Sequence, residues 1–439
     1  MSIPNFENSG TFYSMWLPAE DPLKKQLKPG AVCGMMDAHK AAFPADPYEV
    51  YAMISFLLAV IYVSFISLGL PDSLLGSAWP VMVGQLQVPL SYAGVLSMII
   101  AGGTIVSSLL SDRLTRKFGA GLVTAVSVMM TALALLGFSL SNSFWLLCLI
   151  AIPYGLGAGA VDAALNNYVA LHYASRHMSW LHCFWGVGAT LGPYIMGWAL
   201  ESSLGWQMGY RGVSFIQILL TLVLFLSLPK WKKRGADVGE GEVQEAPLGL
   251  AGALKIRGVK AILFAFFGYC GLETTAGLWA SSYLVEFRGV DPETAAFFAS
   301  MFYLGITIGR FASGFVADRI GDKGMIRIGC GVMLAGIAMV FLPLSTPVLA
   351  LVGLVIAGIG AAPVYPSIIH STPAHFGPEN SHAIVGIQMA SAYCGSTFCP
   401  PIFGLIAQHI DIAWYPVYLA ALALLLLTMT ERVNKTCQS

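Results

Sequence analysis

Three carboxylates stand inside long apolar stretches of the chain. Asp72 is the sole formally charged residue between Glu49 and Asp112, while Asp162 and Glu273 lie in later apolar stretches. An acid within a membrane span is costly unless it is neutral, has a partner or faces a polar cavity. For Asp162 this favours a role in binding and releasing protons. For Asp72 two alternatives stay open: a proton-binding residue inside a span, or a residue that ends a helix in water.

Other polar and aromatic side chains in these stretches could bind a solute. Asn166 follows Asp162 by one helical turn, and His182 and Trp185 are one turn apart, so each pair can share a helix face. The candidate solute-binding residues are Asn166, Asn167, His182, Trp185, Glu273, Trp279 and Gln388. The candidates for an aromatic plane under a sugar ring are Trp185, Trp279, Tyr283, Tyr365 and Tyr393.

Glu273 needs a partner or a polar cavity, because an ionised and unpaired carboxylate is very costly inside a protein. Arg310 is a conceivable partner in the sequence. It lies nearer the end of its apolar stretch, however, and we interpret it as a structural residue that supports the turn at Asp318 and Arg319.

The composition is that of a membrane protein. Of the 439 residues 56% are hydrophobic and 10% are charged, whereas soluble domains carry about 25% charged residues. The formal net charge is zero, so no basic surface for nucleic acid is expected. The eight cysteines are scattered without a C-x-x-C pair, and we expect neither a metal nor another cofactor.

Twelve apolar segments are long enough to span a membrane as helices, since a span needs about 20 apolar residues. The fold class is therefore predicted as an all-α membrane protein. The predicted spans are 51–73, 90–110, 120–140, 144–171, 178–200, 210–228, 261–285, 295–317, 325–343, 348–373, 382–408 and 412–430.

Basic residues concentrate in alternate loops, and this asymmetry predicts the orientation. The positive-inside rule places both termini in the cytoplasm, which requires an even number of spans. We predict a cytoplasmic tail (1–48), a first six-helix bundle (49–228), a cytoplasmic linker (229–260), a second six-helix bundle (261–430) and a cytoplasmic tail (431–439). Whether residues 1–46 belong to the mature protein is left open, because Met36 and Met53 are alternative starts.

The two halves of the sequence resemble each other. GGTIVSSLLSDR (102–113) aligns with IGRFASGFVADR (308–319), and YGLGAG (154–159) aligns with AGIGAA (357–362). Parallel six-helix repeats with a site at mid-membrane between them are typical of one transporter architecture. No strand precedes the glycine-rich segments, so we interpret them as close helix contacts rather than nucleotide loops.

The segment SLLSDRLTRKFGAG (108–121) resembles the loop 2–3 motif of the major facilitator superfamily. Segments 69–80, 154–169, 181–193 and 268–279 are similar to the fucose:proton symporter family, and 181–193 is especially similar to its hexose-transporting members. In that family the first and fourth spans each carry an acid that takes part in proton coupling, and Asp72 and Asp162 match those positions. Asp162 departs from the glutamate that is common there.

A set of residues near the predicted cytoplasmic ends could form a gate. Carboxylates at such loops can face a helix N-terminus or an arginine in one state and separate from it in another. The candidate gate residues are Gly103, Asp112, Arg113, Arg116, Asp318 and Arg319.

The resemblance implies a secondary active transporter that moves a hexose or deoxyhexose by alternating access with proton symport. The alternatives are a proton-coupled exporter of drugs or metabolites and a sodium-coupled uptake system. We expect no enzyme, because the spans contain no nucleophile–base motif. The expected partners are a small-molecule substrate, protons and the lipid bilayer, with a monomeric protein in the cell membrane.

Overall fold

The structure is a computed structural model that describes residues 47–72, 74–89, 92–202, 205–237, 249–342 and 347–437. The chain divides into two compact units, Met1–Leu58 and Ala59–Ser439, and every contact discussed below lies within the second unit. The predicted tail up to residue 46 and the linker residues 238–248 lie outside the described residues.

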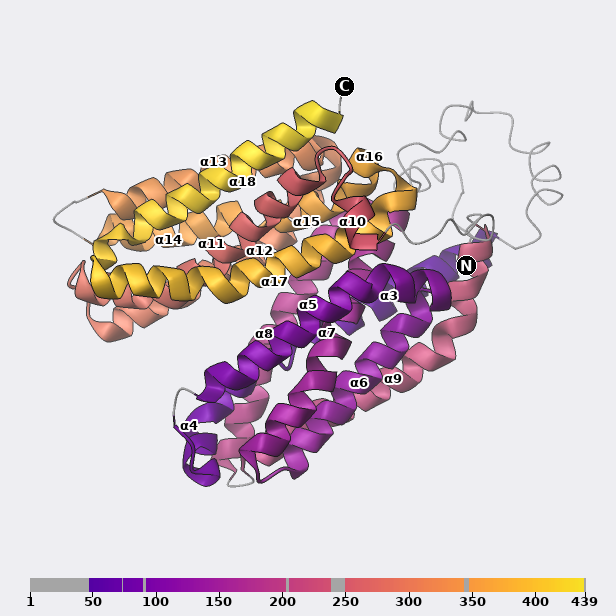
Figure 1. Cartoon of the computed structure of the whole chain (residues 1–439), viewed down its shortest axis with the longest axis horizontal. Helices are drawn as coiled ribbons and strands as arrows, with labels where there is room; N and C mark the ends of the chain where they lie inside the picture. Colours follow the sequence, from indigo (N-terminus) through magenta and orange to yellow (C-terminus); the bar gives the residue numbers. More distant parts are fainter. Residues whose placement is uncertain are drawn as a thin grey trace, which may run out of the picture. The chain divides into compact units, whose positions relative to one another are not determined.

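All regular elements in the described ranges are helices (Figure 1). The first half of the sequence forms α3 (Pro47–Gly69), α4 (Leu74–Leu86), α5 (Tyr92–Phe118), α6 (Ala120–Leu140), α7 (Phe144–His172), α8 (Ser175–Glu201) and α9 (Trp206–Asp237). The second half forms α10 (Gly249–Ala253), α11 (Val259–Glu286), α12 (Pro292–Ile320), α13 (Asp322–Phe341), α14 (Val348–Ala361), α15 (Val364–His370), α16 (Thr372–Phe376), α17 (Pro378–His409), the 3-10 helix η2 (Ile412–Trp414) and α18 (Tyr415–Cys437).

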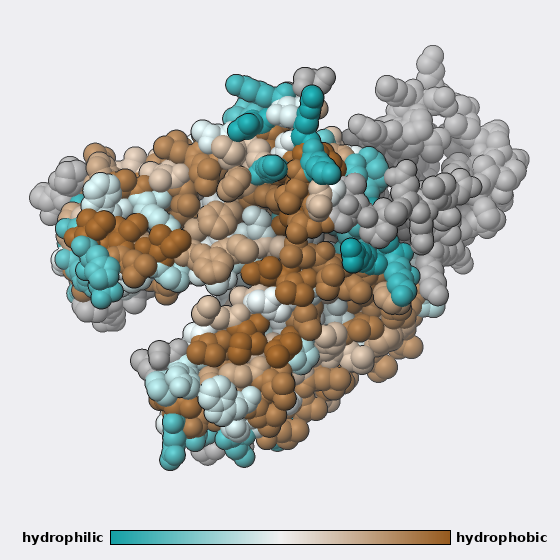
Figure 2. All heavy atoms as spheres, in the orientation of Figure 1, coloured by the Kyte–Doolittle hydropathy of each residue, from teal (hydrophilic) through white to brown (hydrophobic). Residues whose placement is uncertain are grey.

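The helices confirm an all-α membrane protein. Ten helical segments within the described residues are long and apolar enough to cross a membrane. Helices α8 and α17, of 27 and 32 residues, are not among these ten and lie at the other two predicted spans. Figure 2 shows apolar residues over the flanks of the helices and hydrophilic residues gathered near their ends.

Several predicted boundaries differ from the structure. Helix α9 continues to Asp237 and α18 to Cys437, so both extend into segments predicted as linker and tail. Lysine and arginine are good helix formers, and a helix that leaves the apolar layer has no reason to stop at its edge.

Two of the predicted spans are broken helices. The first span stops at Gly69 and resumes at Leu74, with Pro71 in the break. The tenth stops at Ala361 and resumes at Val364 after Pro363. Proline removes a backbone donor and clashes with the preceding turn, which accounts for both interruptions. Each break frees backbone groups and side chains from the regular helical pattern.

Glycines set the closest helix contacts, as the duplicated glycine-rich segments predict. A Cβ atom on Gly159 of α7 would overlap the carbonyl oxygen of Thr104 in α5, and one on Gly358 of α14 would overlap that of Phe302 in α12. Gly103 belongs to this packing, because its Cα faces the backbone of Gly155. Gly103 thereby lets α5 approach α7, and its place in the gate stays a prediction.

Helices from the two halves pack against each other in matched pairs. Helix α5 contacts α17, and α8 contacts α12, while α7 contacts both α15 and α17. These pairs surround the polar residues identified from the sequence, which lie mainly on α7, α8, α11 and α12.

We expect Gly159→Ala to destabilise the protein because the added Cβ would meet the Thr104 carbonyl. Overpacking of a close contact costs about 1–3 kcal/mol, so the thermal unfolding midpoint in detergent should fall. The matched control is Gly102→Ala, where a Cβ would meet nothing within 4 Å. Equal midpoints for the two variants would contradict the assigned role of Gly159.

Candidate solute cavity and gate

A cavity of about 480 Å³ lies between helices of the two halves. The first half contributes residues of α3, α4, α5, α6, α7, α8 and α9, and the second half contributes residues of α11, α12, α15 and α17. The space-filling view shows a hollow between the part that carries α4 and the part that carries α14 and α17 (Figure 2). The cavity volume of about 480 Å³ is within the usual range of small-molecule sites, about 300–1,000 Å³.

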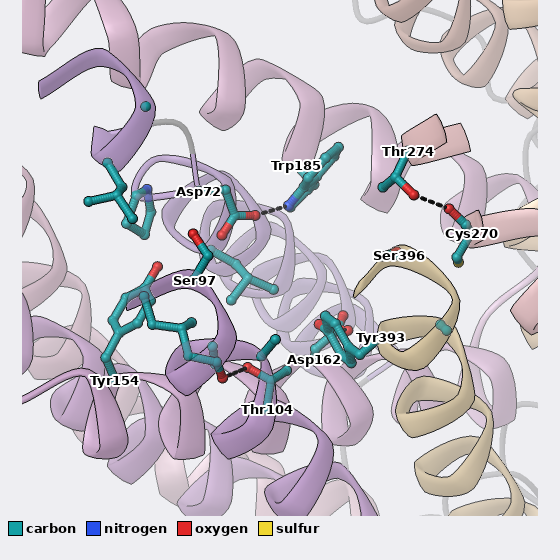
Figure 3. A pocket seen from close by; sticks show the side chains of 18 of the residues that line it. Asp72, Ser97, Thr104, Tyr154, Asp162, Trp185, Cys270, Thr274, Tyr393 and Ser396 are labelled. Carbon is teal, nitrogen blue, oxygen red and sulfur yellow. Dashed lines mark hydrogen bonds between the residues drawn. The ribbon is translucent and has the colours of Figure 1, made fainter. Parts of the chain in front are cut away.

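Asp162 is the most enclosed of the cavity carboxylates, with 4% of its surface exposed. Its Oδ1 accepts a hydrogen bond of 2.8 Å from Asn166 Nδ2, and its Oδ2 accepts one of 2.8 Å from the Tyr393 hydroxyl. Tyr393 lies on α17 and Asp162 on α7, and Figure 3 shows the two side by side. The bond therefore joins the two halves of the chain at the carboxylate itself.

Asn166 relays this contact to His182. The Asn166 amide donates to Asp162, so its Oδ1 accepts, and His182 Nε2 lies 3.0 Å from that oxygen. His182 must therefore carry its proton on Nε2. The ring is also held edge-on against Tyr365 and Phe65, at centroid distances of 4.5 and 5.4 Å.

Asp72 lies in the break between α3 and α4 and faces the cavity. Its Oδ2 accepts a hydrogen bond of 2.9 Å from Trp185 Nε1, as Figure 3 shows. Gly69 makes this approach possible, since a Cβ there would overlap the Trp185 carbonyl oxygen. Asp72 therefore follows a helix end and is also exposed toward the cavity, and its proton-binding role stays a prediction.

Glu273 and Arg310 face each other across the second-half wall of the cavity. The distance from Arg310 Nη2 to Glu273 Oε1 is 3.5 Å, and both residues line the cavity. Arg310 thus meets Glu273, the partner considered in the sequence, and its interpretation as a structural residue stays a prediction. An ionisable residue within a span is a candidate functional residue by default, and that rule applied equally to Arg310.

Four of the seven predicted solute-binding residues are absent from the cavity lining: Asn166, Asn167, Trp279 and Gln388. Asn167 contacts Ser381 and His382 of α17, with Nδ2 2.7 Å from His382 Nδ1. Trp279 donates to the Pro400 carbonyl at 3.0 Å, and Gln388 accepts from Thr372 at 3.0 Å. Asn166 supports Asp162 and His182. The structure brings together Asp72, Asp162, His182, Trp185 and Glu273 around the cavity.

The end of the helices near Arg116, Arg176 and Asp318, here called the basic end, is closed by contacts between the halves. Asp318 of α12 accepts a hydrogen bond of 3.2 Å from the backbone N–H of Arg176 and forms an ion pair of 3.1 Å with its side chain. Arg176 is at the N-terminus of α8, so the carboxylate meets both a helix dipole and an arginine.

A second group of contacts at the basic end centres on Asp322. Ser175 donates to its Oδ1 at 2.6 Å, and His370 Nδ1 lies 2.7 Å from its Oδ2. The other ring nitrogen of His370 lies 3.1 Å from the Tyr173 carbonyl oxygen. Because Ser175 and Tyr173 come from the first half and Asp322 and His370 from the second, this group also closes the cavity.

The predicted gate residues divide in their contacts. Asp112 binds Arg116 of its own helix at 2.7 Å, and Arg116 donates across to the Glu379 carbonyl at 2.6 Å. Arg113 and Arg319 are exposed. Asp318 and Arg116 thus contact the opposite half. The sequence analysis did not identify Asp322, Ser175 or His370, because these residues lie far apart along the chain.

The sequence model of the Major Facilitator Superfamily matches residues 61–387 and 262–430 of this chain. Bypass of stop codon protein 6 of Saccharomyces cerevisiae is 23% identical over 84% of this chain and 80% of that protein. The glucose/mannose transporter GlcP of Bacillus subtilis is 22% identical over 70% of this chain and 77% of its own length.

A solved structure of FucP in an outward conformation has the same fold, with a TM-score of 0.71 and 15% sequence identity. The superposition covers 85% of this chain and 97% of FucP. FucP is described as the fucose:proton symporter of E. coli.

We expect Asp318→Ala to shift the protein toward a state that is open at the basic end. The substitution removes the ion pair and the contact with the α8 N-terminus, together worth about 1 kcal/mol, or about a fivefold change in population. The measurement is the rate at which the cavity residue Cys270 reacts with an impermeant thiol reagent added from the basic side of oriented vesicles.

The control is Asp411→Ala, which removes a carboxylate that caps η2 through Ala413 N–H at 2.8 Å. It should leave the reaction rate unchanged. A rate that rises equally in both variants, or in neither, would exclude Asp318 as a gate residue.

Proposed function

Since the chain belongs to the Major Facilitator Superfamily and is therefore a membrane transporter rather than an enzyme, we propose that it carries a sugar together with a proton by alternating access. The observation that supports this most strongly is the hydrogen bond from Tyr393 of α17 to Asp162 of α7. Because of this hydrogen bond, a change in the protonation state of Asp162 changes a contact between the two halves.

The two aspartates are the proposed proton-binding residues. Both line the cavity, and each accepts hydrogen bonds from neutral donors, Trp185 for Asp72 and Asn166 with Tyr393 for Asp162. Proton binding removes a negative charge from a membrane interior where charge is costly. A protonated carboxyl group carries an O–H that donates a hydrogen bond, whereas a carboxylate only accepts. Protonation therefore changes the hydrogen bond between Asp162 and Tyr393 of α17.

Opening and closing of the gate at the basic end is the proposed conformational step of alternating access. The positive-inside rule assigns this end to the cytoplasm of the cell membrane, with residues 49–228 and 261–430 as the two moving bundles. In the present state the contacts of Asp318 and Asp322 hold the cytoplasmic end closed. Release into the cell then requires those contacts to separate while the opposite end closes.

The cavity lining suits a sugar. Carboxylates and the Arg310 guanidinium provide acceptors and donors for hydroxyl groups, and the rings of Trp185 and Tyr365 supply flat apolar surfaces. GlcP, one of the relatives, is described as a glucose/mannose transporter. We therefore propose a hexose or deoxyhexose as the solute.

The driving force is sufficient for uphill uptake. One proton moving down about 150 mV releases about 3.5 kcal/mol. Every 1.4 kcal/mol corresponds to about a tenfold concentration ratio, so one proton per sugar sustains an accumulation of about a few hundredfold.

The first test replaces the buried acid with a residue of the same size that does not titrate and that can accept one of its two hydrogen bonds. In proteoliposomes, sugar added outside should cause proton entry with the wild-type protein, measured as external alkalinisation. We expect Asp162→Asn to exchange sugar down its gradient but to lose proton-driven accumulation, which falls from about a few hundredfold to about onefold.

Glu431→Gln is the control, because Glu431 pairs with Arg327 outside the cavity. It should behave as wild type. Sugar uptake that depends on sodium instead of protons, or proton-driven export of another compound, would replace the proposed symport with one of the two alternatives. Proton-coupled uptake that persists in Asp162→Asn would exclude Asp162 as the coupling residue.

A second test concerns the bond between the halves. We expect Tyr393→Phe to keep sugar exchange and to weaken coupling, so that the accumulation ratio falls by about tenfold when one hydrogen bond to a charged group is lost. Tyr418→Phe removes a hydroxyl that donates to the Cys399 carbonyl at 3.0 Å and should leave the ratio unchanged. Equal ratios for both variants would contradict the role given to Tyr393.

A further inference from the structure

Arg310 is held in the cavity wall with few acceptors. Its side chain is 4% exposed, yet it lines the cavity. The Nη2 atom lies 3.5 Å from both Glu273 Oε1 and the Tyr269 hydroxyl, and Nε has no acceptor within the described part of the chain. Short hydrogen bonds between charged groups measure about 2.7–2.9 Å, so most of the donor capacity of Arg310 is unused.

Other arginines of this chain make shorter pairs. Arg327 binds Glu431 through two hydrogen bonds of 2.6 and 2.7 Å, and Arg116 binds Asp112 at 2.7 Å. The Glu273–Arg310 pair in the cavity is therefore longer than these two pairs. A buried ion pair offsets its desolvation only with close geometry and with additional hydrogen-bonding partners.

Two aromatic rings fix the position of the Arg310 guanidinium. Its Cζ atom lies 5.8 Å from the ring centroid of Trp185 and 5.9 Å from that of Tyr365. Contacts of this kind stabilise a cation over a ring face. They act on Arg310 from α8 and α15, so the guanidinium is drawn to the rings as well as to Glu273.

The charges of the cavity indicate what can occupy it. The lining residues with formal charge are Asp72, Asp162, Glu273 and Arg310. With protons on both aspartates, the charges of Glu273 and Arg310 sum to zero. An uncharged solute keeps that balance, whereas the carboxylate of a sugar acid would add a negative charge beside Glu273.

We propose that the Glu273–Arg310 pair is the specificity-determining subsite and that it binds two neighbouring hydroxyls of an uncharged sugar. The inference rests on the proposed function, because it names the solute class of the same cavity. A hydroxyl both donates and accepts hydrogen bonds. Two adjacent hydroxyls can therefore donate to the Glu273 carboxylate and accept from Arg310, which supplies the partners that the open pair lacks.

The test uses the full chain in proteoliposomes and measures proton entry and competition for binding. The probes are D-glucose, D-mannose and fucose, the single-deoxy derivatives of glucose at each position, and glucuronate. We expect two adjacent deoxy positions to weaken wild-type binding by about tenfold each, and glucuronate to bind more weakly than glucose.

Arg310→Lys keeps the charge but removes the planar fork of donors. We expect it to weaken glucose binding by about tenfold while changing the binding of those two deoxy derivatives by less than about twofold. Arg327→Lys is the matched control, since Arg327 pairs with Glu431 away from the cavity, and it should match wild type for every probe.

Glu273→Gln gives an independent measurement if Arg310→Lys folds poorly. Removal of the negative charge should shift preference from glucose toward glucuronate by about tenfold, because Arg310 then lacks its counter-charge. Glu431→Gln should show no such shift.

The outcomes separate the two proposals. Proton-coupled sugar uptake by the wild type, with both variants weakening all probes equally, overturns the subsite and leaves symport intact. The expected deoxy pattern without proton entry supports the subsite and overturns symport. Wild-type protein that binds none of the three sugars, or binds glucuronate more tightly than glucose, overturns the subsite.

Discussion

A carboxylate deep in a membrane protein needs hydrogen-bond donors, and at Asp162 one of the two donors comes from the other half of the molecule. Asn166 supplies the first from the same helix, and Tyr393 of α17 supplies the second. The position of α7 relative to α17 is thereby tied to an acid whose charge is costly in this environment. The cavity lining and the proposed coupling both include this contact of α7 with α17 at the carboxylate.

Backbone features bring the acids to the cavity. The break at Pro71 leaves Asp72 outside a regular helix, and Gly69 allows α3 to approach the backbone of Trp185. The glycines of α7 and α14 allow equally close contacts with α5 and α12. The polar residues of the site are therefore held on helices that pack tightly within each half, and the halves meet through α5 with α17 and α8 with α12.

The cavity and the gate use charge differently. At the basic end, carboxylates contact a helix N-terminus, a serine and a histidine. The distances are 2.6–3.2 Å, so each contact is at hydrogen-bonding distance. Inside the cavity, Glu273 and Arg310 remain 3.5 Å apart. The short contacts at the basic end favour a state that is closed at that end. The longer Glu273–Arg310 separation leaves donors and acceptors in the cavity for a solute.

The sequence by itself determined the membrane class, the number of spans and the acids Asp72, Asp162 and Glu273, because hydropathy and isolated charges are local properties that lipid makes costly. It also located the duplicated glycine contacts. Only the tertiary structure decided that Arg310 faces Glu273, that Asn167 and Trp279 are absent from the cavity lining, and that Asp322 contacts Ser175 and His370. Those facts depend on how each helix is rotated about its axis and on which distant helix it meets. Such contacts are set by packing between segments far apart in the chain, and residue type and spacing along one helix do not specify them.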